Sequence, residues 1–131
     1  MTERGLKLDK SGRLVLTEKD VTDQIIGRLC ADGFGCYKLD VGVDAMSGRE
    51  YGEPGMVDFL IVYERRFAFI ELKCPGASPK RHQHAWMAAA ARRGHYVNWW
   101  DSYDTANGGR RPFLADYPDL RRALGREEGR L

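Results

Sequence analysis

Three residues in the middle of the chain have the types and the spacing for phosphodiester chemistry. Twelve residues separate Asp58 from Glu71, and Lys73 stands two residues beyond Glu71. Two carboxylates a few Å apart repel one another, and removing their water without a counter-ion is costly, so such a pair requires a cation. Hard oxygen ligands suit Mg²⁺ or Mn²⁺, which polarise a phosphate and lower the pKa of bound water. A neighbouring lysine then orients that water or stabilises the developing negative charge.

A β-hairpin is needed to bring these residues together. Residues 57–63 and 67–72 are rich in β-branched and aromatic side chains, and the polar break at residues 64–66 has the length of a hairpin turn. With a two-residue loop, the numbers of facing residues sum to 129 or 131, which places Asp58 opposite Glu71 or opposite Lys73. Because strand side chains alternate with period two, all three charges project from the same side at one end of the hairpin.

The same three charges are also compatible with a solvated, ion-paired face that has no chemical role. The apolar residues on that face favour a chemical site over a solvated face. Leu60 and Val62 share the face of Asp58, and Phe67 and Phe69 share that of Glu71. We therefore expect this face of the hairpin to be covered, with the charges at its rim.

The pattern of these residues resembles a known family. Gly55-x-x-Asp58, then Glu71-Leu72-Lys73, and Gln83 on a following helix are similar to the core of the PD-(D/E)XK nucleases, most closely the VRR-NUC domain. The resemblance covers roughly residues 17–102. The family usually has proline directly before the aspartate, where this chain has Val57.

The resemblance implies a restriction-endonuclease-like α/β fold, in which a mixed sheet is flanked by helices in the order α-β-β-β-α-β, with a short C-terminal helix. It also implies a functional role for each of several positions. Asp58 and Glu71, with the Leu72 carbonyl, would hold one or two Mg²⁺ or Mn²⁺ ions, and Lys73 would position or activate the attacking water. Gln83 would reach the catalytic centre, and Glu18 would complete the metal environment. Lys38 matches a basic position of the family.

Length and composition predict a single domain over residues 1–131, and the resemblance implies that its core lies at about 17–102. The chain has 43% hydrophobic and 31% charged residues and no run of eighteen apolar residues, and its first twenty residues are too charged for a signal peptide. Three cysteines without a CxxC pair indicate neither a zinc site nor a disulfide framework, and Cys30 is expected in the core. We therefore expect a cytoplasmic protein without a membrane span.

Local signals predict the other elements. Thr17 as N-cap, with Asp20 three residues later, predicts a helix to about residue 32 that Gly33 ends. Its buried stripe would consist of Val21, Ile25 and Leu29, with Glu18 on the same side. The remaining expected elements are a peripheral hairpin at 5–16, a strand at 34–43, a loop at 42–55, a helix at 79–93 capped by Ser78, a strand at 96–100, a loop at 101–111, a helix at 117–124, and a basic tail at 125–131.

Positive charge gathers after the hairpin, where a phosphate backbone would be contacted. Residues 1–72 hold 10 Lys and Arg against 13 Asp and Glu, whereas residues 73–131 hold 11 against 6. Lys80 and Arg81 stand at the start of the predicted second helix and are candidate DNA contacts, together with Lys38. A solvated helix face is the alternative interpretation of the same cluster.

The leading hypothesis is a metal-dependent DNA endonuclease. The resemblance further implies a structure-selective enzyme that acts on branched DNA, in the manner of a Holliday-junction resolvase, and works as a homodimer. Two alternatives stay open. One is a catalytically silent nucleic-acid-binding or inhibitor module on the same fold, and the other is a sequence-specific restriction or homing nuclease.

Overall fold

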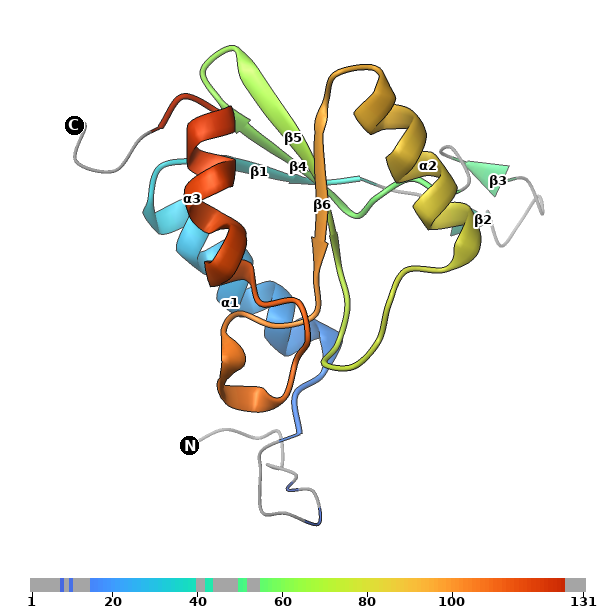
Figure 1. Ribbon diagram of the computed structural model, residues 1–131, viewed down its shortest axis with the longest axis vertical. Helices are drawn as coiled ribbons and strands as arrows, with labels where there is room; N and C mark the ends of the chain where they lie inside the picture. The colour runs from blue at the N-terminus through green and yellow to red at the C-terminus, as the bar shows by residue number, and fades with distance from the viewer. Residues whose placement is uncertain are drawn as a thin grey trace.

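The computed structural model of the chain describes residues 8, 10, 15–39, 42–43, 50–51 and 55–126. In chain order the elements are α1 (Glu18–Ala31), β1 (Gly35–Lys38), β2 (Gly42–Val43), β3 (Glu50–Tyr51), β4 (Phe59–Tyr63), β5 (Arg66–Leu72), α2 (Arg81–Arg92), β6 (Tyr96–Trp100), a 3-10 turn η1 (Thr105–Asn107) and α3 (Phe113–Ala123). The fold is α/β, as expected, and the order of elements agrees loosely with the prediction (Figure 1). No helix in the described part of the chain is long and apolar enough to cross a membrane.

The main sheet is open and mixed, with the strand order β1-β4-β5-β6. β1 and β5 both pair with β4 in antiparallel fashion, and β6 pairs with β5 in parallel. Parallel neighbours require a crossover, and α2 supplies it between β5 and β6, as the sequence predicts. β2 and β3 form a separate two-stranded antiparallel pair.

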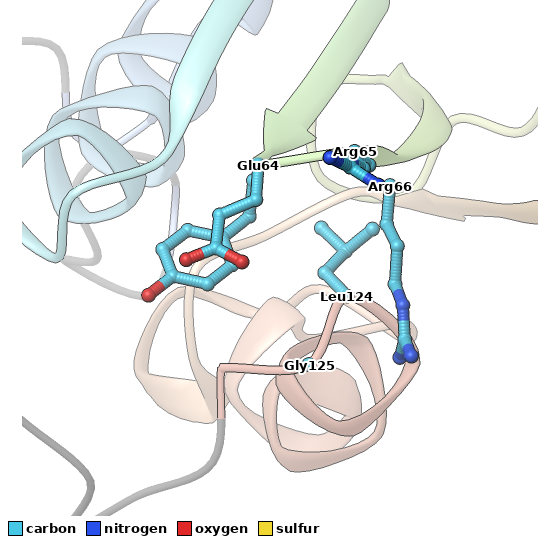
Figure 2. A pocket seen from close by; sticks show the side chains of 6 residues that line it. Glu64, Arg65, Arg66, Leu124 and Gly125 are labelled. Atoms are coloured by element: carbon cyan, nitrogen blue, oxygen red, sulfur yellow. The ribbon is translucent and has the colours of Figure 1, made fainter.

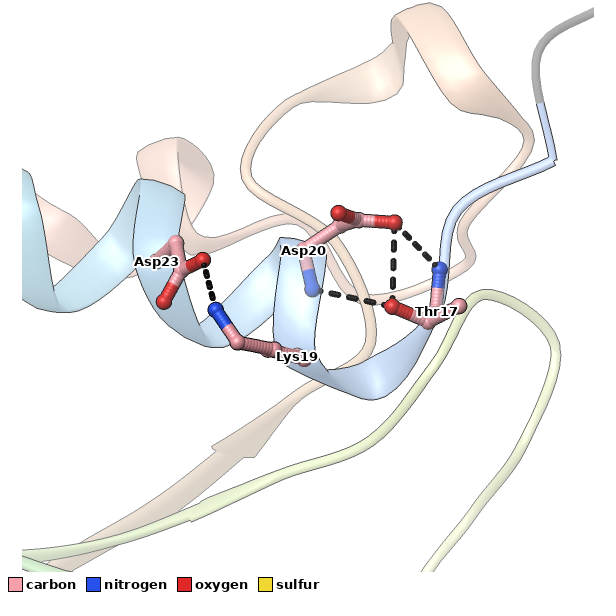
Figure 3. A network of polar contacts seen from close by, with 4 residues as sticks. All are labelled: Thr17, Lys19, Asp20 and Asp23. Carbon is pink, nitrogen blue, oxygen red and sulfur yellow. Dashed lines mark hydrogen bonds and ion pairs between the residues drawn. The ribbon is translucent and has the colours of Figure 1, made fainter. Parts of the chain in front are cut away.

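The first helix has the termini that its sequence predicts. The Thr17 hydroxyl accepts from the Asp20 amide at 3.2 Å, and the Asp20 carboxylate accepts from the Thr17 amide at 2.8 Å, which completes a capping box (Figure 3). Gly33, with φ 93°, follows the helix end. The predicted stripe of Val21, Ile25 and Leu29 is fully buried. The first turn of α1, which carries Glu18, is therefore held by local hydrogen bonds.

The main hydrophobic core lies on the face of the sheet that α1 and α3 cover, whereas α2 lies on the other side (Figure 1). The strands contribute Phe59, Ile61, Ala68, Ile70, Leu72 and Trp100 to it, the helices contribute Val21, Ile25, Leu29, Phe113, Tyr117 and Leu120, and Leu124 joins it directly after α3. Burial of this apolar surface stabilises the sheet edge at which the predicted site residues stand.

The face shared by the predicted site residues is covered only in part, which corrects the expectation of a covered face. Phe69 packs against Trp86 of α2, with ring centroids 5.1 Å apart, but Phe67 is 39% exposed. Leu60 and Val62 are half-buried. Both faces of the hairpin are apolar, so alternation alone does not reveal which of them carries the main core.

Several predicted boundaries are wrong. The strand expected at 34–43 ends at Lys38, which faces Phe59, the first residue of β4; one further backbone hydrogen bond runs from the Leu39 amide to the carbonyl of Asp58, where the chain bends. The expected loop at 42–55 contains β2 and β3. The last helix begins at Phe113, four residues before the predicted start, with Pro118 inside it. Cys30 is exposed rather than in the core, since Leu29 occupies the buried stripe.

Two predicted terminal segments fall largely outside the described residues. Of the expected hairpin at 5–16, residues 8, 10, 15 and 16 are described. Of the expected basic tail at 125–131, residues 125 and 126 are described.

Candidate active site

The hairpin β4–β5 sets the register of the site. Its loop is the two residues Glu64 and Arg65, and the facing pairs run from Tyr63 with Arg66 to Phe59 with Ile70, so the residue numbers sum to 129. Glu64 adopts a φ of 55°, the left-handed backbone that a two-residue hairpin turn demands. This is the first of the two registers that the sequence allows, and the next pair in it is Asp58 with Glu71.

Asp58 and Glu71 meet at the same end of the hairpin, where the carboxylate of each accepts a hydrogen bond from a backbone amide across the hairpin. The Asp58 amide donates to Glu71 Oε1 at 3.0 Å, and the Leu72 amide donates to Asp58 Oδ2 at 3.4 Å. The second bond is long for an amide donor and therefore weak. Each acid is thus held by the backbone of the other strand, and the prediction that the two share one edge is confirmed.

Lys73 and Gln83 both contact Glu71. Lys73 Nζ lies 3.1 Å from Glu71 Oε2, and Gln83 Nε2 donates to the same oxygen at 2.8 Å. Gln83 Oε1 accepts from the Lys80 amide at 2.8 Å, so both ends of the glutamine side chain are engaged. Glu71 is 1% exposed and accepts hydrogen bonds from the backbone and from α2, which fixes its orientation.

The pKa of each of the two acids is raised above its ordinary value. Burial and the charge of Asp58 raise the pKa of Glu71, and the Lys73 ammonium opposes this rise. Burial also raises the pKa of Asp58, against the Leu72 amide and the charges of Lys73 and Lys38. Both carboxyl groups therefore lack full compensation of their negative charge within the protein.

A small pocket of about 210 Å³ adjoins Asp58 and brings two further predicted residues to the site. It is lined by Glu18, Lys19, Thr22, Lys38, Asp58 and Phe59. Glu18 comes from the first turn of α1 and Lys38 from the end of β1. Thr22 and Lys19 were not predicted as site residues. The spacing of four residues between Glu18 and Thr22, which places them side by side on a helix, is the signal that identifies Thr22.

The residues present fit a hard divalent cation held in part by water. No group of three Asp, Glu, His or Cys side chains with metal-binding geometry occurs among the described residues. Mg²⁺ is commonly bound through one or two carboxylates while keeping several of its waters, and Asp58 and Glu71 offer such a pair. Glu71 already accepts several hydrogen bonds, so Asp58, beside the pocket, is the more open of the two acids.

Gly55 explains how the segment before Asp58 approaches α2. Its φ is 83°, and a Cβ built on it would lie 2.5 Å from the carbonyl oxygen of His82. A side chain at this position is therefore excluded on two grounds. The glycine lets the chain entering β4 pass against the first turn of α2, which carries Gln83.

The predicted DNA contacts Lys80 and Arg81 are exposed at the start of α2, and Lys38 is exposed at the end of β1. The start of this helix differs from the prediction. Lys80, rather than Ser78, is the N-cap residue, because the Gln83 side chain caps the Lys80 amide. The Gln83 side chain thus hydrogen-bonds both the Glu71 carboxylate and the backbone at the start of α2.

A larger cavity of about 580 Å³ lies at the turn end of the hairpin (Figure 2). It is lined by Tyr63, Glu64, Arg65, Arg66, Leu124 and Gly125, none of which is a predicted site residue. Glu71 is five residues beyond Arg66 along β5, which separates this cavity from the acids by about 17 Å at the usual rise of a strand. It is therefore distinct from the candidate active site.

A scan of protein-family models and a search of curated proteins each find no match to the chain.

Proposed function

We propose that this protein is a metal-dependent DNA endonuclease that hydrolyses phosphodiester bonds, with a restriction-endonuclease-like fold of the VRR-NUC type. The observation that supports the proposal is the grouping of Asp58, Glu71, Lys73 and Gln83 at one sheet edge, in which Glu71 contacts each of the other three. A mere solvated face would not bury Glu71 to 1% exposure. The mixed sheet with a β5–α2–β6 crossover is consistent with this type of fold.

Each residue has a role in the proposed reaction. Asp58, Glu71 and the Leu72 carbonyl would hold Mg²⁺ or Mn²⁺, with Glu18 at the border of the same pocket. When bound, the ion would polarise the phosphate and lower the pKa of a bound water. Lys73 has three N–H donors, of which one is directed at Glu71, and would orient the attacking water or stabilise the developing charge.

Gln83 acts in this scheme by holding Glu71 rather than by touching the phosphate. Its amide group spans from Glu71 to the Lys80 backbone, so the start of α2 and the catalytic edge are linked. Exposed Lys80 and Arg81 on that helix, and Lys38 across the site, would contact the phosphate backbone on either side of the acids.

The substrate is proposed to be branched DNA, and the active form a homodimer, because symmetric cutting of two strands requires two sites. A protein of this size reads DNA by shape and backbone more readily than by a long sequence. Cutting of linear duplex at one fixed site, without preference for four-way junctions, would instead identify a sequence-specific enzyme.

The test is cleavage of labelled duplex, flap and four-way-junction DNA in Mg²⁺, in Mn²⁺ and in EDTA. We expect divalent-dependent cleavage that Glu71→Gln lowers about a hundredfold or more while DNA binding is retained. Glu64→Gln is the matched control, because it changes the same residue type at the exposed turn of the same hairpin. No cleavage by the wild type, or equal activity in Glu71→Gln, would overturn the proposal and leave a catalytically silent binding module.

A further inference from the structure

The buried carboxylate of Asp101, directly after β6, accepts hydrogen bonds from two loops near the candidate active site. Asp101 is 1% exposed. Its Oδ2 accepts from the Gly76 amide at 3.0 Å and from the Arg110 amide at 2.9 Å. Its Oδ1 accepts from the Arg111 amide at 2.8 Å and from the Ser102 hydroxyl at 3.1 Å. One side chain thus joins the end of β6 to two separate loops.

The carboxylate is held in its charged form by these donors. Burial alone would raise the pKa of Asp101, but the backbone amides and the Ser102 hydroxyl outweigh burial and hold this pKa below its ordinary value. The surrounding loop also leaves no space at Gly109, where a Cβ would lie 2.1 Å from Ser102 Oγ and 2.6 Å from Asp101 Oδ1. The loop is therefore built closely around a negative charge.

The loop joined at Gly76 is the one that begins with Lys73. The Lys73 amide donates to the Trp100 carbonyl at 3.0 Å, and three residues later the Gly76 amide donates to Asp101. The two ends of the segment 73–76 are thus hydrogen-bonded to two consecutive residues, Lys73 to Trp100 and Gly76 to Asp101. The chain then continues from this segment into α2, which carries Gln83. The two side chains that contact Glu71 Oε2, those of Lys73 and Gln83, therefore come from the segment itself and from the helix that follows it.

We propose that Asp101 is a positioning residue for the catalytic edge, which holds the segment 73–76 so that Lys73 is directed at Glu71. The inference rests on the proposed function in assigning a catalytic consequence to this arrangement. It adds a residue for which the sequence pattern predicts no role, since Asp101 lies in a predicted loop 30 residues beyond Glu71. Its action is indirect, because its hydrogen bonds reach Gly76 rather than Lys73 itself.

The test compares Asp101→Asn with Asp116→Asn. The asparagine keeps the shape of Asp101 but has no negative charge and only one acceptor oxygen. The bond from the Gly76 amide is therefore either lost or weakened from a charge-assisted bond to a neutral one, whichever way the asparagine amide is oriented. Asp116 is the matched control, because its carboxylate also fixes β6, accepting from Asn98 Nδ2 at 3.1 Å and from Trp100 Nε1 at 2.9 Å, but joins it to α3 rather than to residues 73–76.

Two measurements separate positioning from general stability. NMR should show altered Lys73 and Gly76 resonances and faster hydrogen exchange at the Gly76 amide in Asp101→Asn, with both unchanged in Asp116→Asn. Single-turnover cleavage should fall about tenfold or more in Asp101→Asn while the Kd for DNA in Ca²⁺ stays within about twofold. In Asp116→Asn cleavage and Kd should both stay close to those of the wild type.

Unchanged Lys73 resonances in a folded Asp101→Asn protein, or equal loss of cleavage in both variants, would overturn the proposal. If Asp101→Asn does not fold, Ser102→Ala removes one of the four donors, and it must shift the Gly76 and Lys73 resonances; no shift is again a refutation. If the wild type does not cleave DNA, the proposed nuclease function fails, and the NMR comparison still decides whether Asp101 positions Lys73.

Discussion

Replacing Gly55 by alanine tests the close approach on which the geometry of the site depends. The substitution forces a Cβ to within 2.5 Å of the His82 carbonyl oxygen, which is backbone and cannot rotate away. It also places a non-glycine residue at φ 83°, a strain of about 1–2 kcal/mol. Overpacking in a closed space adds about 1–3 kcal/mol. We expect Gly55→Ala to lower the free energy of unfolding by about 2–5 kcal/mol.

Gly94→Ala is the control that isolates the steric part of this loss. Gly94 has a φ of 93° but no atom within 4 Å of its built Cβ, so its substitution carries the backbone strain alone, about 1–2 kcal/mol. Urea denaturation of both variants gives the two free energies, and their difference measures the contact of Gly55 with α2. Because the collision pushes the start of α2 away from β4, Gly55→Ala should also weaken the contact of Gln83 with Glu71.

The result that would refute this reasoning is equal destabilisation by the two substitutions. The segment before Asp58 would then not pass against α2, and the position of Gln83 would need another cause. A loss in Gly55→Ala that exceeds the loss in Gly94→Ala supports the described packing, whatever the activity of the protein is.

Three further predictions concern charge and chemistry. A hydrogen bond from Tyr117 holds the pKa of Asp32 below its ordinary value. The Asp32 carboxylate therefore stabilises the fold at pH values above its ordinary pKa, and this stabilisation is lost as the pH falls through the folded pKa. Urea denaturation should show that Asp32→Asn is less stable than the wild type at pH 7, and that the two differ less near pH 2. Burial raises the pKa of Cys36 to about 12, so at pH 8 iodoacetamide should label Cys30 well before Cys36, as mass spectrometry of peptides would show, and equal labelling would contradict it. Mg²⁺ at ten times its Kd should stabilise the wild type by about 1.4 kcal/mol in thermal denaturation and leave Glu71→Gln unchanged, whereas equal stabilisation would place the ion elsewhere.

The sequence predicted best the features that neighbouring residues determine. A two-residue turn and the alternation of side chains limited the hairpin to two registers, with Asp58 opposite either Glu71 or Lys73, and the observed register is the first of these. The start of α1 followed from Thr17 and Asp20, whose side chains contact each other's backbone. In each case the interactions that decide the structure lie within about fifteen residues of chain, so the pattern contains them.

Two of the features that the sequence did not predict depend on partners in other segments of the chain, and one depends on an unexpected local cap. The alternation of residues 34–43 continues past Lys38, but a strand extends only as far as its neighbour, and β4 begins at Phe59, which faces Lys38. The start of α2 depends on Gln83, a side chain within the helix, more than on the preference of Ser78 for the N-cap. Asp101 gave no local signal at all, because its donors come from two loops that only the folded chain brings near.

The pairing of β4 with β5 has a consequence for the path of folding. It is the pairing of shortest sequence separation in the main sheet, and hairpins form within about 1–10 μs, well before strands that are distant along the chain find their place. Asp58 and Glu71 are therefore brought face to face early, while water still surrounds them and screens their repulsion. Dehydration of the two acids comes later, when α2 and β6 close over an arrangement that is already made.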